Sequence, residues 1–309
     1  MSGTHSHHQH SHGGGARATS PARRRALVIA LVLNAAFLVI EFTGGIVFNS
    51  LALVSDAVHQ FSDVVALGIA LGALVMADRP PTARNTYGWK RAEVLAALGN
   101  GVALIAISVW IVVEAIDRFG SPDDANGTAM IVLGLAGLVV NAGSAYVVVR
   151  VSGGNLNLRA AFLHLASDAL GSLAAVVAGI VILATGSTWA DPAASILIAV
   201  LIVLATLQLV RDATGVLLEA APRGLDSDAV TVSLETAPGV AQVHHLHLWS
   251  IGSEEAALSA HVVLEEAESL HAAQEQGDAL KALLAARFGI DHATLELECH
   301  TCEDDHHHA

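Results

Sequence analysis

The chain has 309 residues, of which 53% are hydrophobic and 14% charged, and its mean hydropathy is +0.57. This composition excludes an ordinary soluble domain and predicts a membrane protein. The formal net charge of −14 arises from the C-terminal part, because residues 1–210 hold 11 acidic and 11 basic side chains, whereas residues 211–309 hold 18 and 4. An acidic region of this kind repels nucleic acid, which we exclude as a partner, and attracts cations.

The N-terminal segment, residues 1–25, is His-rich and of low complexity, and we expect it to be disordered until metal binds. Six apolar runs follow it, and each is long enough to cross a lipid bilayer as a helix. They lie at residues 26–48, 51–77, 92–119, 129–149, 158–184 and 189–209. The sequence therefore predicts a six-helix transmembrane bundle over residues 26–210.

Lysine and arginine side chains are concentrated in the connections on one side of this predicted bundle. On that side lie Arg23, Arg24, Arg25, Arg79, Arg84, Lys90, Arg91, Arg150, Arg159 and Arg211. The connections on the opposite side contain only Arg118. Because cytoplasmic loops carry the excess of basic residues, both termini are predicted to be cytoplasmic in a multi-pass protein of the cell membrane.

After residue 210 the pattern changes to that of a small soluble domain, which we place at residues 211–298. A short helix is predicted at 227–237, strands at 240–251 and 256–264, a helix at 269–288 and a strand at 293–298. The order αββαβ indicates a cytoplasmic α+β domain with helices on one face of its sheet. The tail at 299–309 contains Cys299 and Cys302 beside histidines, a pattern typical of metal binding in a reducing compartment.

The most informative motif is H-x-x-S-D, which occurs twice within predicted membrane spans. His59 and Asp63 lie in the second span, and His164 and Asp168 lie in the fifth. A spacing of four residues places the members of each pair on one helix face. Ionisable side chains are costly inside a membrane and are usually functional there, so two matching pairs indicate one shared site rather than two buried structural pairs.

Two imidazole nitrogens and two carboxylate oxygens suit tetrahedral Zn²⁺ better than Mg²⁺ or Ca²⁺, which take more oxygen ligands. The sequence does not rank Zn²⁺ against Cd²⁺ or Co²⁺. When metal leaves, the emptied ligands take up protons, which couples metal to proton movement. Asp56, three residues before His59, fits two roles equally well: an outer partner or proton relay of this site, or a charge near the helix N-terminus.

The soluble domain contains a second group of metal-ligand side chains. Simple strand alternation places His244 on one face of the first strand and both His245 and His247 on the other. His261 lies on the next strand, and His292, Glu296 and Glu298 lie on or beside the last one. Histidine and glutamate side chains from neighbouring strands can bind a metal ion together, although a lone strand histidine is more often only a polar surface residue.

Several long motifs resemble those of the cation diffusion facilitator family, in its zinc-exporting branch. They are SLALVSDAVHQFSD, TYGWKRAEVLAALGNG, NLNLRAAFLHLASDALGSL, TGSTWADPAASILIA and VHHLHLWSIG with LSAHV. The resemblance implies six spans, a cytoplasmic ferredoxin-like domain, a homodimer, and export of metal in exchange for protons by alternating access.

The resemblance also implies roles for particular residues. It makes His59, Asp63, His164 and Asp168 the transport site, with histidine at position 59 as in zinc-type members. It makes His244, His261 and Glu298 ligands of a cytoplasmic metal, with His292 one residue away from a position that other members use. Cys299 and Cys302 are similar to a C-terminal C-x-x-C of some members, but lie closer to the last strand.

The sequence thus predicts a Zn²⁺/H⁺ antiporter rather than an enzyme. One alternative is a membrane metalloenzyme that uses the same ligands, but four protein ligands leave no open position for catalysis. A second alternative is a zinc sensor that signals through its cytoplasmic domain, for which an intramembrane site is unnecessary.

Overall fold

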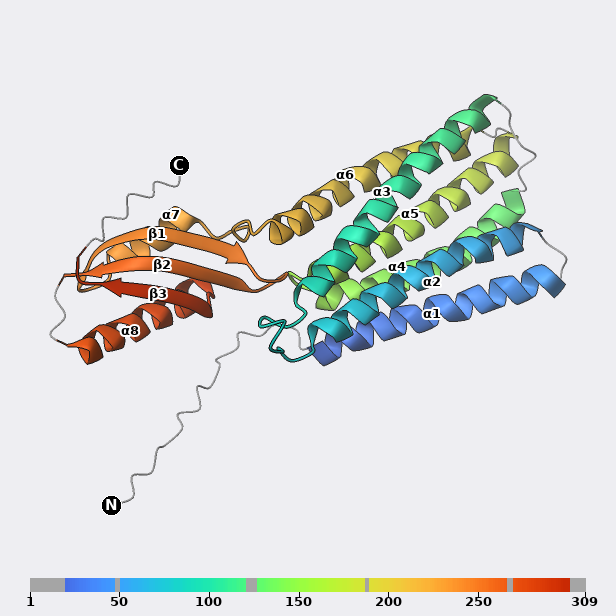
Figure 1. Cartoon of the computed structure of the whole chain (residues 1–309). Helices are drawn as coiled ribbons and strands as arrows, with labels where there is room; N and C mark the ends of the chain where they lie inside the picture. The colour runs from blue at the N-terminus through green and yellow to red at the C-terminus, as the bar shows by residue number, and fades with distance from the viewer. Residues whose placement is uncertain (1–19, 48–50, 121–126, 187–188, 266–268, 301–309) are drawn as a thin grey trace, which may run out of the picture.

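The structure, a computed structural model, describes residues 20–47, 51–120, 127–186, 189–265 and 269–300 (Figure 1). Residues 1–19 of the N-terminal segment, which contain all of its histidines, and Cys302 lie outside the described residues. The described part of the chain forms a bundle of long helices that is joined to a small α/β domain at one end (Figure 1). We refer to the second part, from Pro222 onward, as the C-terminal domain.

Six helices in the described residues are long and apolar enough to cross a membrane. They are α1 (Ser20–Val47), α2 (Leu51–Ala77), α3 (Arg91–Gly120), α4 (Gly127–Ser152), α5 (Leu156–Thr185) and α6 (Ala190–Leu217). The prediction of six spans is confirmed, and α2 has the predicted bounds. The largest extensions beyond the predicted ends lie on the side of the C-terminal domain: α1 begins six residues earlier, and α6 ends eight residues later.

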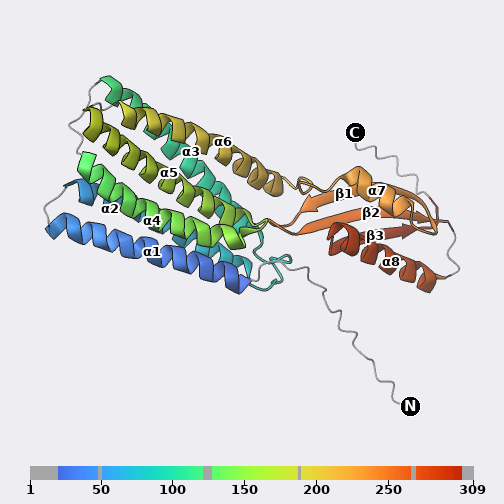
Figure 2. The same cartoon turned by 180° about the vertical axis from the view of Figure 1, so that it is seen from behind.

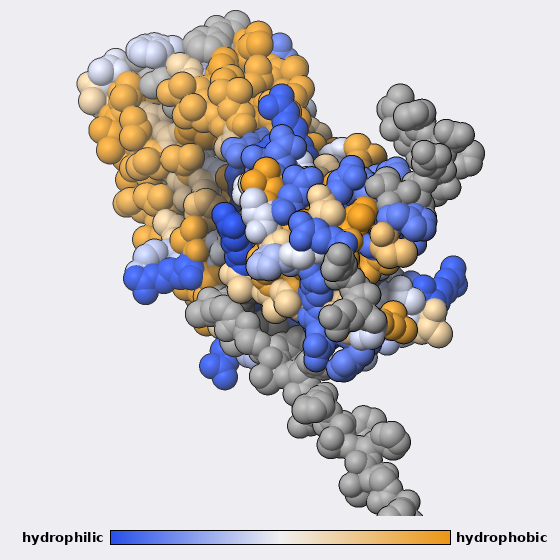
Figure 3. All heavy atoms as spheres, turned by 90° about the vertical axis from the view of Figure 1, so that its left-hand side faces the viewer, coloured by the Kyte–Doolittle hydropathy of each residue, from blue (hydrophilic) through white to orange (hydrophobic). Residues whose placement is uncertain are grey.

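Two apolar cores hold the bundle together. Buried side chains of α1, α2, α4 and α5 form one core, which includes Leu27, Leu67, Leu74 and Leu165. A second core joins α3 and α6 to the beginning of α5. The outward surfaces of the helices expose large apolar side chains, as a lipid environment requires, whereas the C-terminal domain is mainly hydrophilic (Figure 3).

The C-terminal domain has the predicted element order αββαβ. It contains α7 (Ser227–Glu235), β1 (Val240–Ser250), β2 (Ala256–Leu264), α8 (Leu270–Phe288) and β3 (His292–Glu298). The strand order is β1-β2-β3, with β1 antiparallel and β3 parallel to β2. Both helices cover the same face of this sheet (Figure 2), and Leu234, Leu258 and Leu284 are among the buried residues of the core between them.

The turn between β1 and β2, residues 251–255, joins the C-terminal domain to the helix bundle. Its Glu254 forms an ion pair with Arg23 of α1, with Oε2 2.7 Å from Nη1, and accepts a hydrogen bond from the backbone N–H of Gly154 at 3.0 Å. Its Glu255 pairs with Lys90, just before α3, at 2.8 Å. The turn therefore contacts three different parts of the bundle.

Candidate metal centres

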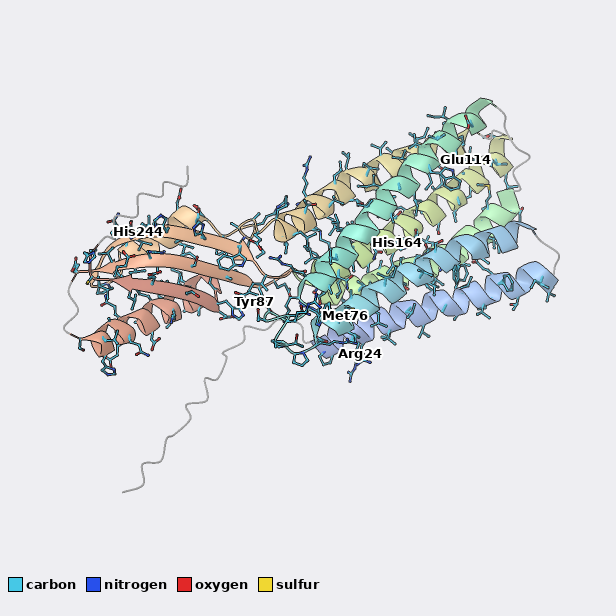
Figure 4. All side chains as sticks on the ribbon, viewed as in Figure 1. Arg24, Met76, Tyr87, Glu114, His164 and His244 are labelled. Atoms are coloured by element: carbon cyan, nitrogen blue, oxygen red, sulfur yellow. The ribbon has the colours of Figure 1, made fainter. Side chains whose placement is uncertain are left out.

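Three of the four side chains predicted for the intramembrane site lie together between α2 and α5. His164 Nε2 is 3.0 Å from Asp63 Oδ1 and 3.8 Å from Asp168 Oδ2. These side chains are shielded from solvent, with 3% of Asp63, 12% of His164 and 14% of Asp168 exposed. Figure 4 shows His164 within the bundle, away from the helix ends.

Local sequence explains how α5 is positioned to bring His164 and Asp168 to Asp63. Asn155 caps the helix, because its side chain accepts a hydrogen bond from the N–H of Leu158. Two residues later, the buried Asn157 donates a hydrogen bond of 2.6 Å to the carbonyl oxygen of Ala70 on α2. This bond ties α5 to α2 about two helical turns from His164 and Asp63, and so supports their approach.

The two remaining residues of the predicted intramembrane group are less fully described. His59 and Asp56 both lie within α2, but their side chains are outside the described part of the structure. The part of the prediction that the structure describes is therefore one imidazole and two carboxylates whose ligand atoms all lie within 4.8 Å of one another. Such a cluster suits a divalent cation, since its two carboxylates balance the charge of the ion.

A second cluster lies on the C-terminal sheet. The register pairs His244 of β1 with His261 of β2, and His261 with Glu296 of β3. Glu298 lies between the two imidazoles: its Oε2 is 3.0 Å from His244 Nε2, and its Oε1 is 2.7 Å from His261 Nδ1. Figure 4 labels His244 at the end of the domain that lies away from the bundle.

The hydrogen bonds around Glu298 change its acidity. Desolvation raises the pKa of this carboxyl, but the hydrogen bonds from His261 and His244 outweigh it, so the pKa lies below its usual value. The carboxylate is therefore ionised at neutral pH. Its negative charge attracts a cation that replaces protons on the neighbouring imidazole rings.

The prediction that His245 lies on the opposite face from His244 is wrong. A β-bulge follows His244, and the His245 Nδ1 atom lies 3.0 Å from the Nδ1 atom of His244. Regular strand alternation, which the prediction assumed, fails at a bulge because one strand gains an extra residue. In the sequence of β1, the signal for this bulge is the pair of adjacent histidines, His244 and His245, which interrupts the alternation of apolar and polar residues.

The structure does not bring His292 to this cluster. His292 pairs with Ala257 in the sheet register, four residues along β2 from His261, which corresponds to about 13 Å. Its ring instead lies edge-on to the ring of Tyr87, with 6.1 Å between the centroids. Cys299 is an exposed free cysteine just after β3, and metal binding by Cys299 and Cys302 in the tail stays a prediction.

Two family models match this chain. The cation efflux transmembrane domain matches residues 27–218, and the cytoplasmic domain of cation efflux proteins matches residues 222–300. Together they cover both the helix bundle and the C-terminal domain.

Similar proteins in bacteria match over nearly their whole length. A cadmium, cobalt and zinc/H(+)-K(+) antiporter of Bacillus subtilis is 38% identical over 281 residues, which are 90% of this chain and 89% of that protein. The metal cation efflux system protein CzcD of Cupriavidus metallidurans is 38% identical over 279 residues, and the zinc transporter ZitB of Escherichia coli is 38% identical over 280; each match covers 90% of this chain and 88% of the relative.

The chain therefore belongs to the cation diffusion facilitator family of efflux transporters, as its motifs predicted. It is a multi-pass membrane protein and not an enzyme. The alternative of a membrane metalloenzyme is thereby set aside.

Proposed function

We propose that this protein exports Zn²⁺ from the cytosol in exchange for protons. The observation that carries the proposal is the cluster of Asp63, His164 and Asp168 between two membrane-spanning helices. Support comes from two of the bacterial relatives: the names of the Bacillus subtilis antiporter and the Escherichia coli transporter include zinc, and the first also names protons and potassium.

In this proposal His59 supplies the fourth ligand, because it precedes Asp63 by four residues on α2. Two imidazoles and two carboxylates then surround the ion, and the loaded site is close to neutral in charge. Protons replace the ion at these ligands on the outer side, after the bundle has changed the side from which the site is open. Asp56 is then either a proton relay or a charge near the helix end.

The remaining parts of the molecule fit the same direction of transport. We place the C-terminal domain and both termini in the cytoplasm, since the basic connections lie at the end of the bundle that contacts this domain. We propose that His244, His261 and Glu298 bind a cytosolic metal ion there. The family model for this region supports a homodimer formed through the C-terminal domain.

The test is zinc flux in proteoliposomes that contain the purified full-length protein. Asp168→Asn should abolish zinc flux, because it removes one charged ligand, while the protein remains inserted. Asp117→Asn, a change of the same kind at an exposed position of α3, should transport as the wild type does. Flux should also rise with an opposing proton gradient. Normal flux through Asp168→Asn would overturn the proposed site, and flux that is independent of the gradient would overturn proton exchange.

A further inference from the structure

His245 occupies an irregular position in β1. Between the pairs His244↔His261 and His247↔Ser259, β1 advances by three residues while β2 advances by two. The φ angle of His245 is +49°, in the left-handed region that residues other than glycine seldom adopt. A bulge with this backbone turns a side chain away from its regular direction, and bulges of this kind are frequent beside functional sites.

The result is a triangle of three imidazole rings. The ring centroids are 5.0 Å apart for His244 and His245, 5.1 Å for His244 and His261, and 5.2 Å for His245 and His261. Each ring has a nitrogen that lies within 4.8 Å of a nitrogen on both of the others. All three edges of the triangle are thus nearly equal.

These spacings agree with those of three histidines bound to one tetrahedral metal ion. With zinc–nitrogen bonds of about 2.0–2.1 Å, tetrahedral angles place neighbouring ligand nitrogens about 3.3 Å apart and ring centroids about 5 Å apart. The Nδ1 atoms of His244 and His245 are 3.0 Å apart. One pair of nitrogens is thus already at the separation that two ligands of one ion need, and a nitrogen of His261 lies within 4.8 Å of a nitrogen on each of the other two rings.

Core packing requires a bulge here, because Val243 and Leu248 are five residues apart and regular alternation would place them on opposite faces of the sheet. His245 is exposed, whereas Val243 and Leu248 on either side of the bulge are buried in the domain core. A non-glycine residue in a sparsely populated backbone region costs about 1–3 kcal/mol and persists when the surroundings enforce it. The packed core on either side enforces this backbone, and the bulge leaves the exposed ring of His245 beside the rings of His244 and His261.

We propose that His245 is a metal ligand, and that His244, His245 and His261 form a three-imidazole site in the C-terminal domain. Glu298 contacts two of the three rings and adds a negative charge beside the ion. Three imidazoles select transition-metal ions such as Zn²⁺ or Co²⁺ over Mg²⁺ and Ca²⁺. This inference rests on the proposed function, in which the C-terminal domain binds a cytosolic metal ion. It adds His245 as a ligand, which regular strand geometry would place on the opposite face of the sheet.

The experiment compares His245→Asn with His247→Asn in the full-length protein in detergent. Both residues are exposed on β1, but only His245 belongs to the triangle. Asparagine lacks the imidazole and tolerates the left-handed backbone, so the bulge should be retained. His245→Gly, which adopts this backbone without strain, is a second variant that removes the ring.

All variants are made on the Asp168→Asn background, so that the result does not depend on transport. Bound Zn²⁺ and Co²⁺ are titrated against a competing chromogenic chelator. His245→Asn and His245→Gly should each lose one tight equivalent or weaken it at least about tenfold, as the loss of a ligand requires. His247→Asn should match the background protein, and Mg²⁺ in excess should not compete.

The proposal is overturned if His245→Asn and His245→Gly bind metal as tightly as the background protein, or if His247→Asn loses as much. Folding is checked by the melting temperature without metal, which should not fall in any of the three variants. The proposed transport function has its own separate test. Normal zinc flux through Asp168→Asn would refute the transport site, yet it would leave the result of this titration intact.

Discussion

Glu254→Gln tests how the C-terminal domain is attached to the bundle. The Glu254 carboxylate makes two contacts with the Arg23 guanidinium, at 2.7 and 2.8 Å, and a third with the N–H of Gly154. The side chains of Arg23 and Glu254 are only 10% and 20% exposed. Glutamine keeps the shape and one oxygen, but it removes the negative charge that balances the Arg23 guanidinium in a largely buried place.

The expected loss lies between two known limits. Removing one partner of a buried ion pair costs about 3–5 kcal/mol, whereas an exposed pair contributes about 0.2–1 kcal/mol. Because water reaches a small part of this pair, we expect about 2–4 kcal/mol. In a protein of this size one kcal/mol corresponds to about 2 °C, so the melting temperature should fall by about 4–8 °C.

The assay is thermal unfolding of the purified protein in detergent, followed by tryptophan fluorescence at one fixed scan rate, because unfolding of large proteins is often irreversible. The matched control is Glu255→Gln. Its ion pair with Lys90 has a similar length, 2.8 Å, but the side chains are 40% and 30% exposed. The control should lower the melting temperature by less than about 2 °C. Equal losses in the two variants, or no loss in Glu254→Gln, would refute the reasoning from burial.

Two further predictions concern packing inside the bundle. A Cβ atom at Gly134 of α4 would lie 2.9 Å from the carbonyl oxygen of Ser172 on α5, whereas a Cβ atom at Gly143 would meet nothing within 4 Å. Gly134→Ala should therefore destabilise the protein by about 1–3 kcal/mol, and Gly143→Ala should not. Thermal unfolding measures both. Gln60 donates a 2.7 Å hydrogen bond to Asn34 in the membrane. Gln60→Leu should cost about 1–3 kcal/mol in the same assay, because it leaves the buried amide oxygen of Asn34 without this donor.

The six membrane-spanning helices could be predicted because few backbone conformations are stable in a lipid bilayer. A long apolar segment in lipid has to satisfy its own backbone hydrogen bonds, so an apolar run and a helix coincide. This is why α2 has the predicted bounds. The argument fails at the end of α6, which extends eight residues past the predicted apolar run: there Asp212 pairs with Arg159 of α5 at 3.0 Å. That stabilisation is tertiary and leaves no trace in local hydrophobicity.

The two candidate metal centres differ in how much of them could be predicted. In the bundle, the repeated H-x-x-S-D motif pointed to Asp63, His164 and Asp168, because ionisable residues in apolar spans are rare. On the sheet, proximity depends on register and on one backbone angle. The parallel register places His292 opposite Ala257, and the bulge places His245 beside His244. The register does not follow from the alternation of polar and apolar residues, whereas the bulge leaves a break in that alternation at the doublet His244–His245.

The contacts between the β1–β2 turn and the bundle differ in burial, and this difference indicates which contact breaks first if the bundle changes conformation as proposed. α5, which carries His164 and Asp168, begins next to Gly154, and Gly154 and Arg23 both bind Glu254. The contact of the same turn with α3 is the more exposed pair of Lys90 and Glu255. Exposed pairs contribute less than buried ones, so a rotation of α3 against the other helices breaks the Lys90 contact at lower cost than the Arg23 contact. The β1–β2 turn should therefore follow α1 and the start of α5 in such a movement, and the sheet that holds the three imidazoles should follow with it.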